Sequence, residues 1–394
     1  MRKTLGVLAV LSCVACGSEG MGVRLEEQPV QQFEAERWSP ADDPTRLGGS
    51  LEFNLARLPL DGTVAKRPWV GSYWPVALDS INYPWAGYRS ASAAEKYERA
   101  FGGYHVEDAV SRYHGIDSVG MPSCASDGEC SRSQVCARRR GRAYGRCIPG
   151  WWGLCHAWAA AALLMPEPQR PVTYNGVQFR VQDLKALATV VHHHTKALNV
   201  SLRCNDSGIR VDGVGRPIDP TCRDTNPGTF HVLLANLLGK RGQSFLEDRS
   251  MDGDVWNQPI LKYNVVSIHE VSEREANAWL EVPNQTYPYN RKAQRFVHVV
   301  TDVYFLREST AEIDGVVDIR NYTFKDRYAY ILELDREGNI IGGEWARVEF
   351  SGGRRTSKTD HPDFLWVPIA ADTASAAGGA ISYKAVMDLV SHAY

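Results

Sequence analysis

The chain has 394 residues, of which 44% are hydrophobic and 10% aromatic. This much apolar surface can offset the entropy lost on folding, so a disordered chain is excluded and one large domain or two smaller ones are expected. With 44 basic and 46 acidic residues the net charge is −2. The broad basic surface of a nucleic-acid-binding protein is therefore also excluded.

The N-terminus has the pattern of an export signal. Arg2 and Lys3 precede an apolar run over residues 5–14, which has the length of a secretory signal rather than of a membrane span. Small residues before Cys16 and polar residues after it resemble a bacterial lipoprotein signal. We predict cleavage before Cys16 and lipid on its sulfur; Cys13 is a second candidate, and an ordinary signal peptide is the alternative interpretation.

The segments after Cys16 predict how the mature chain is organised. Residues 17–50 are rich in Glu, Gln, Pro and Asp, a composition typical of a flexible tether. Residues 51–394 are predicted to form the folded domain. The protein should thus be exported, either as an outer-membrane or cell-surface lipoprotein or in secreted form.

Hydrophobic periodicity predicts helices at 92–101, 106–113, 155–165 and 182–198. Enrichment in β-branched and aromatic residues predicts strands at 230–238, 243–248, 262–269, 296–306, 328–334 and 340–345, with a hairpin turn at 335–339. Helices followed by a run of strands indicate an α+β fold rather than a doubly wound sheet. His192, His193 and His194 end the fourth helix and point in different directions, so a solvated face with one half-buried member is expected there and no shared metal ion.

Four clustered cysteines predict a small disulfide-rich insertion at 122–149. They are Cys124, Cys130, Cys136 and Cys147. In an exported chain such a segment is best read as two disulfides, since a zinc site would bring ligands in C-x2-C pairs and none is present. We choose the interleaved connectivity, Cys124 to Cys136 and Cys130 to Cys147. The insertion is expected to rim the active site or to brace the preceding loop.

Among the three cysteines not yet assigned, one is expected to remain a free thiol. Cys204 and Cys222 bracket a loop rich in Gly, Pro and Asp, which a third disulfide would close. Cys155 is then the only unassigned cysteine, and it lies where a Gly-containing loop enters an apolar helix. A helix N-terminus lowers a thiol pKa and offers backbone N–H groups to an oxyanion, so Cys155 is the predicted nucleophile.

A nucleophilic thiol needs a base that is oriented by a further group. His231 at the start of one predicted strand and Asp248 at the end of the next form our first choice. His298 and Asp302, four residues apart on one strand, are the alternative base and orienter. A purely structural role for His231 remains open.

Several motifs resemble the transglutaminase elicitor family, best known from oomycete cell-wall glycoproteins that plants recognise. Val255-Trp256-Asn257-Gln258-Pro259 looks like the core of the family's elicitor peptide. Further matching segments are 69–75, 92–101, 153–158, 226–231, 248–249, 341–345 and 361–366, so the resemblance covers roughly residues 51–366. The lipoprotein-like start and the insertion at 122–149 depart from the oomycete pattern.

This resemblance implies a protein-glutamine γ-glutamyltransferase with a papain-like core, in which the nucleophile begins a helix packed on an antiparallel sheet. Cys155 would form a thioester with a glutamine side chain, which a lysine amine resolves to an isopeptide bond. The expected partners are proteins or peptides with Gln and Lys. Trp152, Trp158 and Trp256 are candidates for the substrate cleft, with core packing as the alternative for the first two and a surface loop for the third.

Two other functions remain open at this point. A papain-like cysteine protease or glutamine deamidase would use the same residues with water as the acceptor, and a non-enzymatic surface recognition protein would keep only the fold. No cofactor or metal site is predicted. Asp252 and Asp254 flank a glycine, but two carboxylates are too few for a calcium loop, which leaves calcium dependence open.

Overall fold

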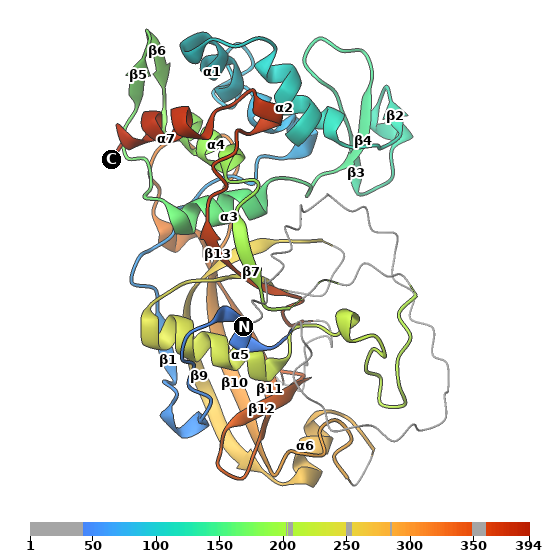
Figure 1. Cartoon of the computed structure of the whole chain (residues 1–394). Helices are drawn as coiled ribbons and strands as arrows, with labels where there is room; N and C mark the ends of the chain where they lie inside the picture. Colours follow the sequence, from blue (N-terminus) through green and yellow to red (C-terminus); the bar gives the residue numbers. More distant parts are fainter. Residues whose placement is uncertain (1–41, 202, 204–207, 250–253, 284–285, 349–359) are drawn as a thin grey trace, which may run out of the picture.

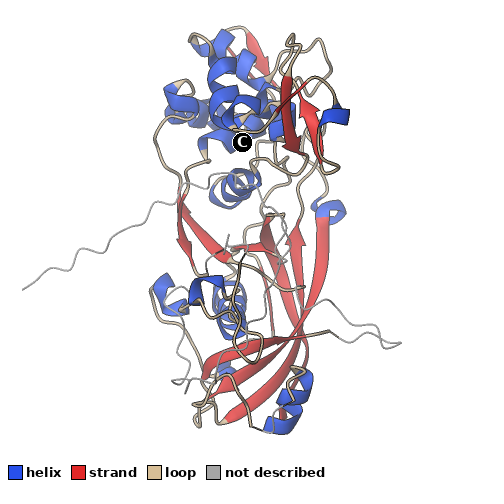
Figure 2. Ribbon diagram, turned by 90° about the vertical axis from the view of Figure 1, so that its right-hand side faces the viewer, coloured by secondary structure: helices blue, strands red, loops and turns tan. Residues whose placement is uncertain are grey.

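The computed structural model describes residues 42–394 except 202, 204–207, 250–253, 284–285 and 349–359. Most helices gather at one end of an elongated molecule, and the long strands form the other end (Figures 1 and 2). The predicted signal, Cys13, Cys16, most of the tether, Cys204 and Asp252 lie outside the described residues. Within the described part, no helix is both long enough and apolar enough to cross a bilayer.

The helical end contains α1 (Ala93–Phe101), α2 (Val106–His114), α4 (Val181–Val191) and α7 (Tyr383–Ser391). A hairpin of β5 (Val172–Tyr174) and β6 (Val177–Phe179) lies beside them (Figure 1). The first two helices were expected at these positions. Ser92 begins α1 because its hydroxyl accepts a hydrogen bond from the Glu95 N–H, which satisfies one of the free donors of the first turn.

The other end is an antiparallel sheet in the order β12-β11-β10-β9-β8-β13-β7, with β1 added beside β9. Its strands are β1 (Asp61–Thr63), β7 (Lys196–Asn199), β8 (Leu246–Asp248), β9 (Asn257–Val271), β10 (Arg295–Leu306), β11 (Thr323–Leu334), β12 (Ile340–Ala346) and β13 (Leu365–Ala370). A short helix, α6 (Glu273–Trp279), connects β9 and β10. The fold is thus mixed α and β with antiparallel sheets, and the predicted turn at 335–339 joins β11 to β12.

The segment predicted as a strand at 230–238 is helical. Here α5 (Pro227–Leu233) continues into a π-helical stretch, Leu234–Lys240, and packs on β11 and β12. Asn226 caps the helix through a bond from the Gly228 N–H, and Pro227 is pre-set for its first turn. The prediction was wrong because a short, continuously apolar run has no period that separates a buried helix from a buried strand.

The fourth helix ends earlier than predicted. It stops at Val191, and residues 196–199 form β7 beside β13 instead of a further helical turn. The three histidines therefore lie in the turn between them. His192 is buried and its Nδ1 lies 2.7 Å from the Ala188 carbonyl, His193 is half-buried and only His194 is exposed. The expectation of a solvated histidine face was wrong, because the turn folds two of these rings inward.

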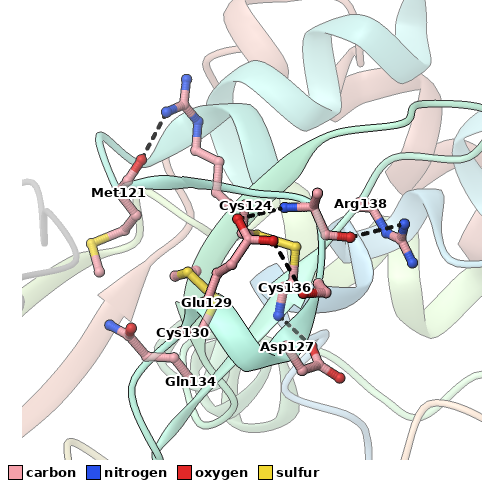
Figure 3. The surroundings of a disulfide bond; sticks show 12 residues. Met121, Cys124, Asp127, Glu129, Cys130, Gln134, Cys136 and Arg138 are labelled. Atoms are coloured by element: carbon pink, nitrogen blue, oxygen red, sulfur yellow. Dashed lines mark hydrogen bonds between the residues drawn. A yellow bond between two sulfur atoms is a disulfide. The ribbon is translucent and has the colours of Figure 1, made fainter.

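The insertion has both predicted disulfides, in the interleaved connectivity. Cys124 is bonded to Cys136 and Cys130 to Cys147 (Figure 3). They join three short strands, β2 (Ser123–Cys124), β3 (Gln134–Ala137) and β4 (Gly145–Pro149). Cys124, Cys130 and Cys136 bring their sulfur atoms close together, but sulfur in a disulfide is no thiolate ligand for a metal. Cys222 is also in a disulfide.

The insertion braces the loop that leads to Cys155. Ala137 and Ile148 pack with Val76, Ile116 and Trp152 in a small separate hydrophobic cluster. The Trp152 carbonyl also accepts a hydrogen bond from the Val76 N–H at 2.8 Å. Since β4 ends only a few residues before the cysteine, these contacts fix the path of the chain into the next helix.

The helix α3 (Cys155–Leu164) lies between the two ends of the molecule (Figure 1). It contacts α4 on one side and β9 and β13 on the other. Ala157 to Ala162 are all buried, so the helix is enclosed on every side rather than amphipathic. Enclosure of the whole helix holds its first residue, Cys155, against the edge where β8, β9 and β13 meet.

Candidate active site

Cys155 begins α3 and is the free cysteine among the described residues. Its Sγ lies 3.6 Å from the Val255 carbonyl oxygen, to which the thiol donates, and 3.4 Å from Nδ2 of Asn257. Only 6% of the residue is exposed. The thiol therefore faces the first residues of β9, where the Val255–Pro259 motif begins the strand.

The amide of Asn257 has one defined orientation. The indole Nε1 of Trp366 donates a hydrogen bond to its Oδ1 at 2.8 Å. An indole nitrogen can only donate, so Oδ1 must face Trp366 and the NH₂ group must face the sulfur. Asn257 is thus a fixed hydrogen-bond donor at the thiol, buried like its partner from β13.

Burial raises the pKa of the Cys155 thiol to about 11, with a smaller raising effect from Glu308 and Asp248. Hydrogen bonds from the side chain and backbone of Asn257 lower the pKa but do not reverse the shift. Burial therefore opposes the lowering of the thiol pKa that is expected at a helix N-terminus, because desolvation disfavours the thiolate. The thiol must lose its proton to a base as it reacts.

The thiol titration gives a first prediction. Because the pKa is raised, alkylation of Cys155 by iodoacetamide should be slow at pH 7.5 and still increase with pH above about pH 10, where an unperturbed thiol of pKa about 8.5 has already reached its plateau. The rate at each pH is obtained by quenching the alkylation at timed intervals and measuring the mass of the intact protein. A plateau below pH 8 would contradict the buried, protonated thiol.

Two carboxylates lie near the thiol. Asp248 ends β8 directly opposite Asn257 in the sheet, and its Oδ1 accepts a hydrogen bond from the Trp256 N–H at 3.1 Å. Glu308, just after β10, accepts from Nε2 of Gln258 at 3.0 Å, and burial raises its pKa. Glu308 was not predicted from the sequence, because no motif marks a glutamate in the loop that follows a strand.

His231 is not brought to the thiol. It lies on α5, and its Nδ1 is 2.8 Å from the Tyr330 hydroxyl. Tyr330 pairs with Val299, and Val299 with Ile268, which is eleven residues beyond Asn257 along β9. At about 3.3 Å per residue this separation is on the order of 30 Å. The structure therefore does not bring His231 to Cys155, because helix α5 replaces the predicted strand and hairpin that would have placed it there.

The alternative pair is also remote. His298 pairs with His269 near the far end of β9, and its ring stacks on Trp279 of α6 with centroids 4.1 Å apart. Asp302 binds Lys325 and Arg327 on the neighbouring strand β11. Both residues therefore stabilise the sheet in this structure, and the structure does not bring either to Cys155.

The three candidate tryptophans occupy different environments. Trp158 is fully enclosed in the core and Trp152 is buried in the cluster below the insertion, so both pack the interior rather than a cleft. Trp256 is half-buried, and its ring meets Tyr73 edge to face with centroids 5.4 Å apart. The backbone carbonyl of Tyr73 also accepts a hydrogen bond from the Leu154 N–H. Trp256 and Tyr73 are therefore the aromatic residues beside the thiol.

The buried histidines give a second prediction. Burial lowers the pKa of His231 to about 4, below its unfolded value of about 6.5, so its contribution to stability is complete above pH 6.5 and is lost as pH falls toward 4. Urea unfolding at pH 7.5, 5.5 and 4.5 should show a smaller acid-induced loss in His231→Phe than in the wild type. Equal losses in the two proteins would contradict it.

The chain resembles known proteins in both sequence and structure. The sequence profile described as transglutaminase elicitor matches residues 44–394. The chain belongs to the transglutaminase elicitor family. It is also similar to the crystal structure of the GP42 transglutaminase from Phytophthora sojae, at 35% identity and a TM-score of 0.75, over 91% of this chain and 99% of that one. A search of curated proteins gives no match.

In this member of the transglutaminase elicitor family, the Val255–Pro259 motif forms one wall of the site. Val255 and Asn257 contact the thiol, and the backbone N–H of Trp256 is held by Asp248. The expectation of a surface loop near the site therefore needs correction. The motif enters β9 at the sulfur, because Asn257 lies opposite Asp248 in the β8–β9 pair.

Proposed function

We propose that this protein is an exported transglutaminase that joins glutamine and lysine side chains through a thioester on Cys155. The observation that carries the proposal is a free, buried thiol at a helix N-terminus, held by an amide donor whose orientation is fixed. Membership of a transglutaminase family and the likeness to a transglutaminase structure support it. The helix-on-sheet setting of the thiol supports a papain-like core.

The chemistry begins with the thiol proton. As Cys155 sulfur attacks the γ-carboxamide carbon of a glutamine, the proton passes to a carboxylate and a tetrahedral oxyanion forms. Nδ2 of Asn257 and the backbone N–H of Cys155 at the start of α3 are the donors for that oxyanion. Collapse of the intermediate returns the proton to the leaving nitrogen, releases ammonia and leaves the thioester. A lysine amine then attacks the thioester carbon, the carbon–sulfur bond breaks, and the amine proton passes through the carboxylate to the departing Cys155 sulfur, which leaves the isopeptide bond and the free thiol.

We assign the proton transfer to Glu308. Its pKa is raised by burial, and a base is most effective when its pKa lies near the working pH. Of the two carboxylates that act on the thiol pKa, Glu308 has the larger effect. Asp248 holds the Trp256 backbone and so positions the residue before Asn257.

An amine-incorporation assay tests the proposal. Wild-type protein, a glutamine-containing peptide and a fluorescent primary amine should give a labelled peptide and free ammonia, and Cys155→Ala should give neither. Glu308→Gln should lower kcat by about 10²-fold or more, within the usual range for a general base. His298→Gln serves as the matched control and should retain activity, because that ring lies at the far end of the sheet. Ammonia release or peptide cleavage without amine incorporation would identify a hydrolase and contradict the proposal.

Export and lipid attachment are part of the proposal. The disulfides of the insertion support an oxidising compartment, because cytosolic thiols are kept reduced. Growth with a radiolabelled fatty acid should label the wild type but not Cys16→Ser. Label that persists in Cys16→Ser and disappears in Cys13→Ser would place the lipid on Cys13. Absence of label from the wild type would indicate a secreted protein without a lipid anchor.

A further inference from the structure

Four histidines meet where the end of α2, the start of α3 and the turn after α4 come together. His114 ends α2, His156 is the second residue of α3, and His193 and His194 lie in the turn. The centroid of the His193 ring lies 4.6 Å from that of His114, 4.8 Å from that of His156 and 4.6 Å from that of His194. His193 is therefore the centre of the cluster.

Three of these rings, those of His114, His156 and His193, are buried or half-buried. Burial, then repulsion from the neighbouring rings, lowers the pKa of His114 and of His156 to about 4, and the same causes lower that of His193. Within the described part of the chain, the groups that act electrostatically on these three rings are other histidines of the cluster. The rings of His156 and His193 are joined by a hydrogen bond, so one of the two nitrogens carries a proton and the other accepts it.

Two of the ring nitrogens are hydrogen-bonded to each other, and a metal ion would replace the proton between them, which moves to the other nitrogen of its ring. His156 Nε2 lies 3.0 Å from His193 Nδ1. Zinc binds imidazole nitrogen at about 2.0–2.1 Å in tetrahedral sites, which places neighbouring ligands roughly 3.4 Å apart. A small outward movement would open this pair to an ion.

The other two histidines differ in what they can contribute. His114 Nε2 accepts a hydrogen bond from the Ala377 N–H at 3.3 Å, so its Nδ1 carries the proton and His114 serves as packing. His194 is exposed, and in this structure its ring nitrogens are not yet within ligand distance of those of both other rings. Rotation of His194 toward the pair supplies a third ligand, and a water molecule can fill the fourth position from the solvent side.

We propose that His156, His193 and His194 bind a transition-metal ion of the Zn²⁺ type. Imidazole sets favour Zn²⁺, Ni²⁺ and Cu²⁺, whereas Ca²⁺ and Mg²⁺ require oxygen ligands. The ion would tie the first turn of α3 to the end of α4, one residue from Cys155. Its binding is independent of the proposed acyl transfer, because no ligand touches the reacting sulfur.

Cobalt and zinc titrations of the chelator-treated full chain test the site. Co²⁺ should produce the visible absorption bands of tetrahedral coordination, and calorimetry with Zn²⁺ should give one ion per chain. His193→Ala and the exposed variant His194→Ala should each weaken binding by about tenfold or more. His392→Ala, an exposed histidine near the C-terminus, is the matched control and should bind as the wild type does.

A further variant distinguishes this histidine site from metal binding at the nucleophile. Cys155→Ala should bind Co²⁺ unchanged, and loss of binding in that variant would place the metal at the thiol and overturn the proposal. Because His194 is exposed, its variant should fold, which circular dichroism checks. Absence of binding by the wild type at 100 micromolar Zn²⁺, or wild-type affinity in both His193→Ala and His194→Ala, would also overturn it.

Discussion

Replacing Asn257 with alanine should lower kcat for amine incorporation about 10²–10³-fold, the usual effect of removing one oxyanion donor. The amide hydrogen-bonds the sulfur in the resting protein, and a tetrahedral oxyanion would form within reach of the same NH₂ group. Its loss also removes the side-chain hydrogen bond that lowers the thiol pKa, while the backbone hydrogen bond of residue 257 remains, so the thiol becomes harder to deprotonate. Steady-state kinetics with the glutamine peptide and fluorescent amine measure the change, and KM should vary much less than kcat.

Trp366→Phe is the matched control for the orientation of the amide. The variant keeps the aromatic packing and the Asn257 side chain but removes the indole donor that fixes Oδ1. Once the amide can rotate, its oxygen can face the sulfur, so we expect a loss of activity that is smaller than in Asn257→Ala. If both variants retain activity within about threefold of the wild type, Asn257 has no role at an oxyanion, since such a role is worth far more.

The sequence predicted the elements whose pattern is local. Helices α1 and α2 follow a three- and four-residue spacing of apolar residues, and β10 to β12 are rich in β-branched and aromatic residues. The disulfide-rich insertion and the unpaired Cys155 followed from the number of cysteines and the expected export. In each case a few neighbouring residues are enough to determine the structure.

The general base could not be predicted from the sequence, because its position depends on contacts between segments that are distant along the chain. The run from Phe230 to Leu238 is apolar without a period, and packing on β11 and β12 decides that it is helical. That difference turns His231 toward Tyr330 and away from the thiol. Asn257 contacts the Cys155 sulfur and Glu308 acts on its pKa from more than a hundred residues further along the chain, so only the tertiary fold brings these groups together.

Replacing Trp158 with alanine should destabilise the protein by about 3–5 kcal/mol, the range for large aromatic side chains removed from a core. Trp158 lies one turn after Cys155 on α3 and has no exposed surface. Its ring is in close contact with the backbone of Gly71, where a Cβ atom would lie 2.5 Å from the ring. Urea unfolding followed by circular dichroism measures the loss.

Two further variants show whether this packing positions the nucleophile. Trp158→Phe keeps most of the apolar volume and should cost less than the alanine variant, while Gly71→Ala introduces a clash with the same ring and should cost 1–3 kcal/mol, about the usual effect of overpacking. Because α3 is enclosed on all sides, a shift at Trp158 moves Cys155 relative to Asn257. Activity should therefore fall in all three variants even at temperatures where each is fully folded. Full activity in folded Trp158→Ala would mean that the first turn of α3 is held by the Leu154–Tyr73 and Cys155–Asn257 contacts alone.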